Sequence, residues 1–323
     1  MNKRRRISLC RLTVRFARVR SGLAESFEDA TVVALDGSGK IVFASGNPDT
    51  PVFYRSAIKP FQALAAARAG LDLPDEHLAV TCASHGGFPV HIGIVEAILT
   101  DHELTMDHLR CTPGRPLSRT ADELQLMGGN SKLEPRFHNC SGKHSGWLAA
   151  CRVTGWDTET YLDPDHPLQR SIVEIIAEFT EIDPEPVGVD GCGAPTLRGS
   201  VVGLARAFCH LGSDAELAPI ARAMTRFGAL VADNVRADGR LGLWWGGPQK
   251  IGATGLIGMT RNGVTIAAKA HSGNPEVAVA AALIAAERIG ALPVAALDAL
   301  EDQIRPPVIG AGRTVGRMEL IDA

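Results

Sequence analysis

An Asn-Gly pair between two apolar runs constrains the fold of this chain more than any other feature of its sequence. Arg261-Asn262-Gly263 separates the apolar runs Thr254–Met259 and Val264–Ala270. Because Asn-Gly tolerates the positive φ angles of a two-residue turn, the two runs are predicted to pair as an antiparallel hairpin. The alanine-rich stretch Pro275–Ile289 follows, with Asn274 as its N-cap, and is predicted to form a buried helix.

A second hairpin is predicted near the start of the chain. Ala30–Asp36 and Ile41–Ser45 are rich in β-branched and small apolar residues, and the residues between them have turn chemistry. From Ser56 the apolar spacing becomes helical and ends at Gly70. Leu78–Ala83 is predicted to be a buried strand.

The middle of the chain is predicted to be mostly helical. The expected helices are His91–Leu104, Lys143–Val153, Pro167–Phe179, Leu197–His210 and Leu217–Asp233. An order of hairpin, helices, hairpin and helix favours an α+β fold, with an antiparallel sheet flanked by helices and a helical lobe. No repeat or long linker divides the chain, so we expect one domain over residues 21–323, built of two closely packed lobes.

Composition excludes several classes of protein. The chain of 323 residues has a net charge of −3, which gives no electrostatic basis for binding nucleic acid. No segment approaches the roughly 18 apolar residues of a membrane span. The seven cysteines are an odd number, which argues against a disulfide framework and predicts a cytoplasmic location. Residues 1–20 carry eight basic residues and no acid, and we expect a disordered tail there.

Ser56 and Lys59 form the first candidate catalytic pair. Residues three apart share one face of a helix, so their side chains can meet. A lysine whose usual pKa is about 10.4 becomes a general base only if burial or a nearby cation lowers its pKa. A neutral amine can then take the proton of the serine hydroxyl, which activates the oxygen as a nucleophile. By itself the Ser-x-x-Lys spacing also fits a solvated or N-capping serine.

Two further residues strengthen this interpretation. Serine enzymes that recognise penicillin combine Ser-x-x-Lys with a second serine and a lysine on a late strand. Ser84 follows a predicted strand, and Lys269 ends the late hairpin. The sequence therefore offers a complete set of these four groups.

Several longer motifs carry a resemblance to a known family. They are Tyr54-Arg55-Ser56-Ala57-Ile58-Lys59-Pro60-Phe61-Gln62-Ala63-Leu64, Cys82-Ala83-Ser84-His85, His138-Asn139-Cys140-Ser141-Gly142-Lys143-His144-Ser145-Gly146, Asp165-His166-Pro167-Leu168-Gln169 and Asp190-Gly191-Cys192-Gly193-Ala194-Pro195. In this order they resemble the rhizobial-type L-asparaginases (asparaginase II). The resemblance implies a fold like that of serine β-lactamases and glutaminases, a homodimer, and hydrolysis of L-asparagine to L-aspartate and ammonia through an acyl-enzyme on Ser56.

The resemblance also implies residue roles. It pairs Ser56 with Lys59 and Ser84 with Lys269, and it gives Arg55 a part in orienting the substrate. It further implies a zinc ion, non-catalytic or modulatory, held by Cys140, Lys143 and Cys192, and no organic cofactor. Without the resemblance, the two cysteines would be read as small buried residues, because the usual paired zinc motifs are missing.

Asp190 and His85 are expected to take part in substrate binding. An α-ammonium group needs a carboxylate partner in a desolvated pocket, and Asp190 adjoins a glycine-rich turn that allows close approach. The residue could equally serve as a turn-forming aspartate before glycine. His85 is interpreted as a hydrogen-bonding group beside the site, since the lysines already supply the base.

The sequence departs from the family pattern at some polar positions. Gly252-Ala253-Thr254-Gly255 stands where the family usually has Gly-Ala-Glu-Gly, and Ala270-His271-Ser272-Gly273 replaces an acidic pair after Lys269. These changes leave the serine and lysine residues in place but alter their surroundings. Three functions remain open: hydrolysis of a small-molecule amide, acyl transfer to an amine, and non-catalytic binding of an amino acid or metal.

Overall fold

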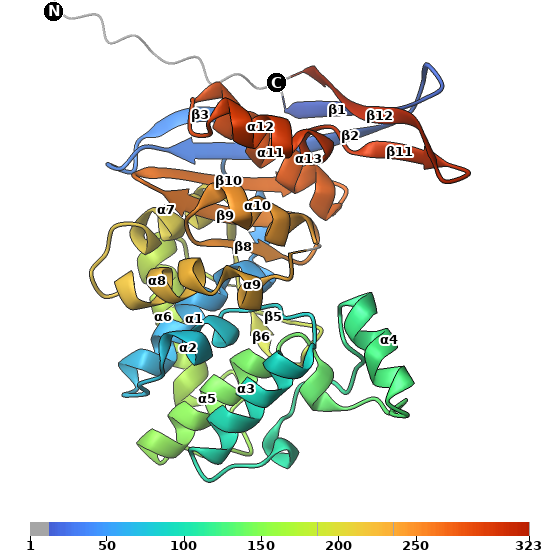
Figure 1. Cartoon of the computed structure of the whole chain (residues 1–323). Helices are drawn as coiled ribbons and strands as arrows, with labels where there is room; N and C mark the ends of the chain where they lie inside the picture. Colours follow the sequence, from blue (N-terminus) through green and yellow to red (C-terminus); the bar gives the residue numbers. More distant parts are fainter. Residues whose placement is uncertain (1–12, 186, 235, 323) are drawn as a thin grey trace, which may run out of the picture.

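The computed structural model describes residues 13–322, except residues 186 and 235, and has the expected α+β architecture. One antiparallel sheet lies at one end of the molecule and a group of helices at the other (Figure 1). The strands of the main sheet are β1 (Val14–Arg20), β2 (Leu23–Leu35), β3 (Ile41–Ser45), β8 (Gln249–Gly252), β9 (Leu256–Arg261), β10 (Val264–Ala270), β11 (Pro307–Gly310) and β12 (Arg313–Asp322).

The strand order is β11-β12-β1-β2-β10-β9-β8, and β3 pairs with β2. Both predicted hairpins therefore belong to one sheet, which confirms that part of the prediction. Asn262 and Gly263 have φ angles of 48° and 75°, as a tight hairpin turn requires. β8 is the strand at one edge of this order, a position that matters for the site.

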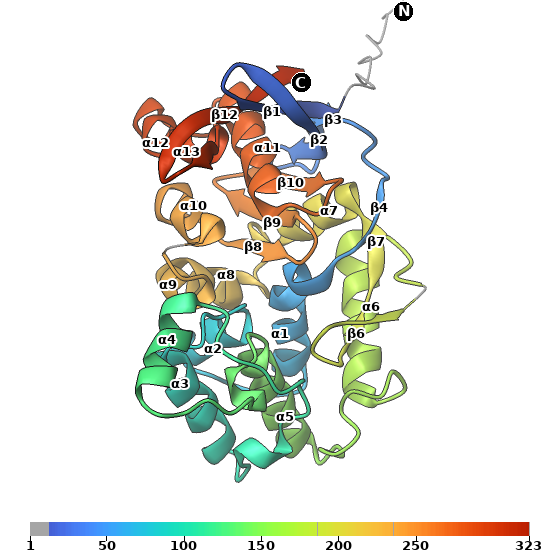
Figure 2. The same cartoon turned by 90° about the vertical axis from the view of Figure 1, so that its right-hand side faces the viewer.

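Helices cover both faces of the sheet (Figure 2). Val32 and Ala34 of β2 pack in the core that includes α11 (Pro275–Arg288), whereas Val33 and Leu35 pack in the larger core with α7 (Val201–Leu211). Successive side chains of a strand point to opposite faces, so two packed faces explain why β2 is apolar at consecutive positions. The Asn274 side chain accepts a hydrogen bond from the Glu276 N–H and caps α11 as expected.

The remaining elements form the helical end, its connections to the sheet, and further helices that pack beside the sheet. They are β4 (Pro51–Phe53), the short 3-10 helix η1 (Arg55–Ile58), α1 (Lys59–Arg68), α2 (Asp75–Thr81), α3 (Pro89–Thr100), α4 (Arg119–Met127), α5 (Ser141–Thr154), α6 (Pro167–Thr180), β5 (Gly188–Val189), β6 (Pro195–Thr196), β7 (Arg198–Ser200), α8 (Ala218–Arg226), α9 (Gly228–Val231), α10 (Ala237–Trp245), α12 (Val294–Ala299) and α13 (Glu301–Ile304). None of the helices in the described part is long and apolar enough to cross a membrane.

Several local predictions are wrong. The predicted helix Leu197–His210 begins only at Val201, because Arg198–Ser200 form β7, and the predicted helix Leu217–Asp233 is divided into α8 and α9.

The run predicted as the strand Leu78–Ala83 lies in and just after α2, because a short apolar run fits a buried helix as well as a buried strand. Within the predicted tail, residues 1–12 lie outside the described residues, but Val14–Arg20 form β1 between β2 and β12. Val14 and Phe16 are fully buried and alternate with an exposed arginine, a strand pattern that the basic composition obscured.

The burial of β1 generates a prediction about stability. Phe16→Ala should lower the free energy of unfolding by about 3–5 kcal/mol, because it removes a fully buried aromatic side chain. Phe27→Ala is the matched control on the neighbouring strand, since 55% of that side chain is exposed. Chemical denaturation of both variants measures the difference. Equal effects would mean that β1 is not part of the folded core.

Candidate active site

Ser56 and Lys59 lie at the junction between the sheet end and the helical end. β4 leads into η1, which carries Ser56, and Lys59 is the first residue of α1. Arg55, directly before Ser56, has a φ of 50°, in the left-handed region that non-glycine residues seldom occupy. Such strained residues are concentrated at functional sites, where the surrounding structure holds them in place.

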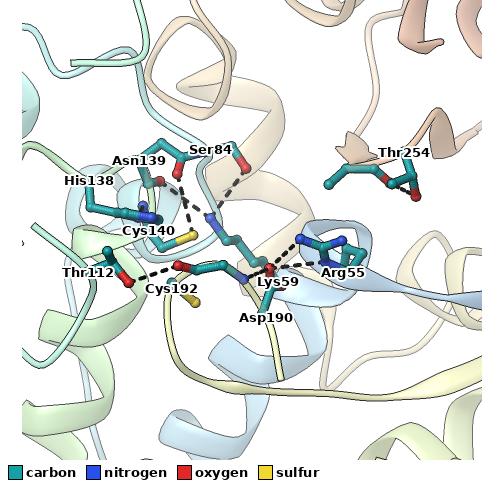
Figure 3. A network of polar contacts seen from close by, with 12 residues as sticks. Arg55, Lys59, Ser84, Thr112, His138, Asn139, Cys140, Asp190, Cys192 and Thr254 are labelled. Atoms are coloured by element: carbon teal, nitrogen blue, oxygen red, sulfur yellow. Dashed lines mark hydrogen bonds and ion pairs between the residues drawn. The ribbon is translucent and has the colours of Figure 1, made fainter. Parts of the chain in front are cut away.

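The Lys59 side chain is buried and directed at Ser84 (Figure 3). Its Nζ lies 3.3 Å from Ser84 Oγ, and it also donates to the backbone carbonyl oxygens of Ala83 and Asn139. These three acceptors match the three donors of an ammonium group. Ser84 follows α2, so the loop after that helix places the hydroxyl next to the lysine.

A second buried lysine contacts the same hydroxyl. Lys250 Nζ lies 2.9 Å from Ser84 Oγ and 2.8 Å from the carbonyl oxygen of Ile251. Only 1% of its surface is exposed. The Ser84 hydroxyl is therefore held between two lysine side chains that come from α1 and β8.

This arrangement corrects the expected pairing of Ser84 with Lys269. Lys269 Nζ donates instead to the carbonyl oxygens of Thr254 and Ala270. The order of the strands explains this difference. β8 is the edge strand that packs against η1, whereas Lys269 is on β10, which lies two strands away from β8. The sequence did hold a signal for Lys250, because it stands two residues before the Gly252-Ala253-Thr254-Gly255 element.

Gly252 allows β8 to lie against η1. A Cβ atom at this position would come within 2.8 Å of the Tyr54 carbonyl oxygen and 3.3 Å of Ala57. Contacts that short would displace the backbone of one of the two elements, so glycine sets the distance between them. That distance brings Lys250 within reach of Ser84.

Burial and neighbouring charges lower the pKa values of both lysines. Burial lowers the pKa of Lys59. Burial, together with the charge of Lys59, lowers the pKa of Lys250 to about 7. A second cation near a buried ammonium favours its neutral form. Near neutral pH, Lys250 is thus an amine that can exchange a proton with Ser84.

Ser56 and Ser84 both line one cavity of about 540 Å³. Within the described residues, the Ser56 hydroxyl has no hydrogen-bond partner, so the expected bond to Lys59 is not formed in this structure. Ser56 lines the cavity without such a bond, whereas Lys59 donates to Ser84. Catalytic hydrogen bonds are often long or unmade before substrate binds, which is consistent with this state.

Arg55 and Asp190, both expected to bind substrate, contact each other. Arg55 Nε and Nη2 donate to Asp190 Oδ1 at 3.0 and 2.7 Å. Figure 3 shows the two side chains pointing toward each other. The Gly191 N–H donates to the same oxygen at 2.6 Å. The hydrogen bond to Asp190 raises the pKa of Arg55 above its usual value. The carboxylate expected to hold an ammonium group therefore already has a cationic partner.

His85 does not lie where a substrate-binding residue would. Its side chain is fully buried, and its Nε2 lies 2.9 Å from Ser141 Oγ. Burial holds the pKa of His85 well below its usual value, so the ring is neutral. It does not line the cavity that Ser56 and Ser84 share. The expectation of a substrate contact at His85 is therefore corrected to a buried packing position behind Ser84.

The three residues expected to hold zinc lie together. Lys143 Nζ donates to Cys192 Sγ at 3.3 Å. A hydrogen bond from the Cys192 thiol holds the pKa of Cys140 well below its usual value, which favours the thiolate. Burial lowers the pKa of Lys143, but the Cys192 and Cys140 sulfurs outweigh it and raise the pKa overall. Two sulfurs and one amine suit zinc, provided that the ammonium first loses its proton.

Within the described residues, no group of three or more histidine, cysteine, aspartate or glutamate side chains could hold a metal ion. Lysine is not among these residue types. Any ion at this place would therefore need Lys143 as a ligand beside the two sulfurs.

Comparisons with known proteins point to one family. The family model described as L-asparaginase II matches residues 16–320. A comparison with curated proteins finds no match. Among solved structures, the crystal structure of Mglu is 15% identical, with a TM-score of 0.43, over 81% of this chain and 67% of that chain. Mglu in its tris and glutamate form is 16% identical, with a TM-score of 0.44, over 86% and 63%. The chain thus spans about two thirds of the length of these structures.

The buried Lys250 generates a prediction about pH and stability. Its pKa is about 7 when folded and near 10.5 when unfolded, so the unfolded chain binds more protons between these values. Stability should therefore rise with pH from 7 to 10. Lys250→Met should remove this part of the slope and raise the free energy of unfolding at pH 7 by several kcal/mol, on the order of 4.

Lys269→Met is the matched control, because Lys269 is only partly buried. Denaturant unfolding of the wild type and both variants at pH 7 and pH 10 measures the slope. A wild-type slope that persists unchanged in Lys250→Met would show that another group causes it.

Proposed function

Because the chain belongs to the L-asparaginase II family, we propose that it hydrolyses the amide of a small molecule, in the first place L-asparagine to L-aspartate and ammonia. Family membership supports amide hydrolysis in general. The observation that supports the mechanism is the Ser84 hydroxyl held between Lys59 and Lys250, beside the Ser56 hydroxyl in one cavity. Nothing but serine and lysine chemistry is needed for the steps that follow.

In the proposed reaction, Ser56 Oγ attacks the amide carbon and forms an acyl-enzyme. Lys59, one helical turn further on, takes the proton of the Ser56 hydroxyl. As the carbon–nitrogen bond breaks, that proton passes to the leaving nitrogen, which departs as ammonia. A water molecule then attacks the ester, releases the acid and restores the Ser56 hydroxyl. Before the attack, Lys59 gives a proton to the neutral Lys250 through the Ser84 hydroxyl that both lysines contact, and so becomes the neutral amine that accepts the Ser56 proton.

A second candidate is hydrolysis or acyl transfer with an amide other than asparagine. Thr254 stands on the cavity wall where the family pattern has a carboxylate. Its φ of 62° is unusual for a β-branched residue, so the backbone at this lining residue is strained. A cavity of about 540 Å³ is also in the range of sites for molecules larger than asparagine.

The test is to trap the covalent intermediate. Purified protein is incubated with asparagine, glutamine and a set of small substituted amides, and ammonia release is measured. An acid quench followed by peptide mass mapping should place the acyl group on Ser56. Ser56→Ala should reduce turnover by several orders of magnitude, because it removes the attacking atom.

Ser84→Ala is the control for the second serine. It should slow turnover but leave the acyl group on Ser56. An acyl group mapped to Ser84 would exchange the roles of the two serines. Hydrolysis that survives Ser56→Ala would contradict the mechanism, and a wild type that releases no ammonia from any amide would favour a non-catalytic binder.

We also propose that Cys140, Lys143 and Cys192 hold zinc in a non-catalytic role. When bound, the ion would neutralise the Cys140 thiolate and change the electrostatic field at Lys59. Because Lys143 and Cys192 must lose protons, zinc affinity should rise with pH and binding should release protons. Calorimetry in buffers of different ionisation enthalpy counts those protons. Zinc affinity that is unchanged in Cys192→Ser would contradict this site.

The homodimer and the cytoplasmic location stay predictions. Analytical ultracentrifugation of the purified chain tests the first, with a mass of about twice 34.2 kDa expected.

A further inference from the structure

Three charged residues line the cavity that Ser56 and Ser84 share. In the described part of the chain they are Arg236, Asp238 and Glu276. Arg55 and Asp190, the pair expected to hold the substrate, do not line it. Arg236 and Asp238 lie at the start of α10, and Glu276 is an exposed residue at the start of α11.

The first turn of α10 is fixed relative to the catalytic lysine. Gln249 Nε2 donates to the Asp238 carbonyl oxygen at 2.9 Å, and Gln249 is the β8 residue directly before Lys250. Asp233 Oδ1 accepts a hydrogen bond from the Arg236 N–H at 2.9 Å. The first bond connects the backbone of Asp238 to β8, the strand that positions Lys250, and the second fixes the backbone of Arg236 against Asp233 just before α10.

Arg236 and Asp238 both have side-chain polar atoms without a hydrogen-bond partner. Asp238 is only 3% exposed, and its Oδ2 has no hydrogen-bond partner. Arg236 Nε and Nη2 have none either, and the ion pairs from Nε to Asp233 and Asp238 measure 3.4 and 3.6 Å. Charge-assisted hydrogen bonds are about 2.7–2.9 Å long. The ion pairs of Arg236 are longer than that, and Asp238 Oδ2 accepts no hydrogen bond, so a ligand can supply the missing hydrogen bonds at both side chains.

The contrast with the other ion pair is clear. Arg55 makes two short hydrogen bonds to Asp190, which also accepts one from Gly191. Arg55 and Asp190 therefore hydrogen-bond to each other, whereas Arg236 has unused donors and Asp238 an unused acceptor on the wall of the cavity. A ligand that complements both needs a carboxylate and an ammonium group a few bonds apart.

We infer that Arg236 and Asp238 bind the head group of a zwitterionic α-amino acid whose side-chain amide is cleaved at Ser56. Arg236 receives the α-carboxylate and Asp238 the α-ammonium. The inference rests on the proposed hydrolysis of an amino-acid amide and adds the two residues that determine specificity for its head group. It assigns to Asp238 the role that the sequence suggested for Asp190.

The experiment uses three amides that differ only in the head group. L-Asparagine has both charges, succinamate lacks the ammonium, and 3-aminopropanamide lacks the α-carboxylate. Arg236→Gln should raise KM about tenfold or more for asparagine and succinamate but leave 3-aminopropanamide unchanged. Asp238→Asn should raise KM for asparagine and 3-aminopropanamide but leave succinamate unchanged. Arg236→Lys keeps the charge and should recover part of the affinity.

Arg55→Gln and Asp190→Asn are the matched controls, since they alter an ion pair of the same kind outside the cavity. If these variants show the group-selective pattern and Arg236→Gln and Asp238→Asn do not, the inference is overturned. Thermal unfolding of every variant separates a loss of binding from a loss of fold.

A binding measurement separates this inference from the proposed function. Calorimetric titration of Ser56→Ala with L-aspartate, succinate and β-alanine needs no turnover. L-Aspartate should bind, and adding Arg236→Gln or Asp238→Asn should weaken it about tenfold or more. If the wild type releases no ammonia but this pattern holds, the reaction is wrong and the head-group site stands. If L-aspartate does not bind, or binds equally to all variants, the head-group site is wrong.

Discussion

The site depends on two buried lysines that share one serine hydroxyl. Lys59 approaches Ser84 Oγ from α1 and Lys250 approaches it from β8, and neither lysine has more than 1% of its surface exposed. Two ammonium groups so close and so far from water repel each other and lack hydration, so the protein favours the loss of one proton. The burial that would destabilise an ordinary lysine pair thus supplies a neutral amine near pH 7, the group that a serine nucleophile needs.

The fold supports this arrangement through close backbone contacts. Gly252 lets the edge strand β8 lie against η1, so that Lys250 reaches the loop after α2. A side chain at Gly142 of α5 would collide with Val80 of α2. Glycine therefore lets the start of α5 approach α2 and the loop that follows it. That start carries Cys140 and Lys143. The candidate zinc ligands and the serine–lysine group are therefore placed by the same packing, and charge at one alters the pKa values at the other.

The sequence predicted elements whose signals are local and failed where tertiary contacts decide. The hairpin at Asn262-Gly263 and the helix capped by Asn274 follow from turn and capping chemistry, and the structure has both. The motif around Ser56 and Lys59 was found because its members are close in sequence. Lys250 and Lys269 both lie on late strands, and the strand order explains why Lys250 is the one that reaches Ser84. Local spacing likewise could not show that Arg55 and Asp190 would pair across 135 residues.

The central claim is that Lys250, and not Lys269, works with Ser84 and Lys59. Ammonia release from the amide that the wild type cleaves best, measured for Lys250→Met and Lys269→Met at pH 8, tests it most directly. Both variants replace an amine by a side chain of similar length, so they differ only in position. We predict that Lys250→Met loses at least two to three orders of magnitude in kcat, in the range of lost acid–base catalysis, while Lys269→Met stays within about tenfold of the wild type. The reverse order would contradict the account.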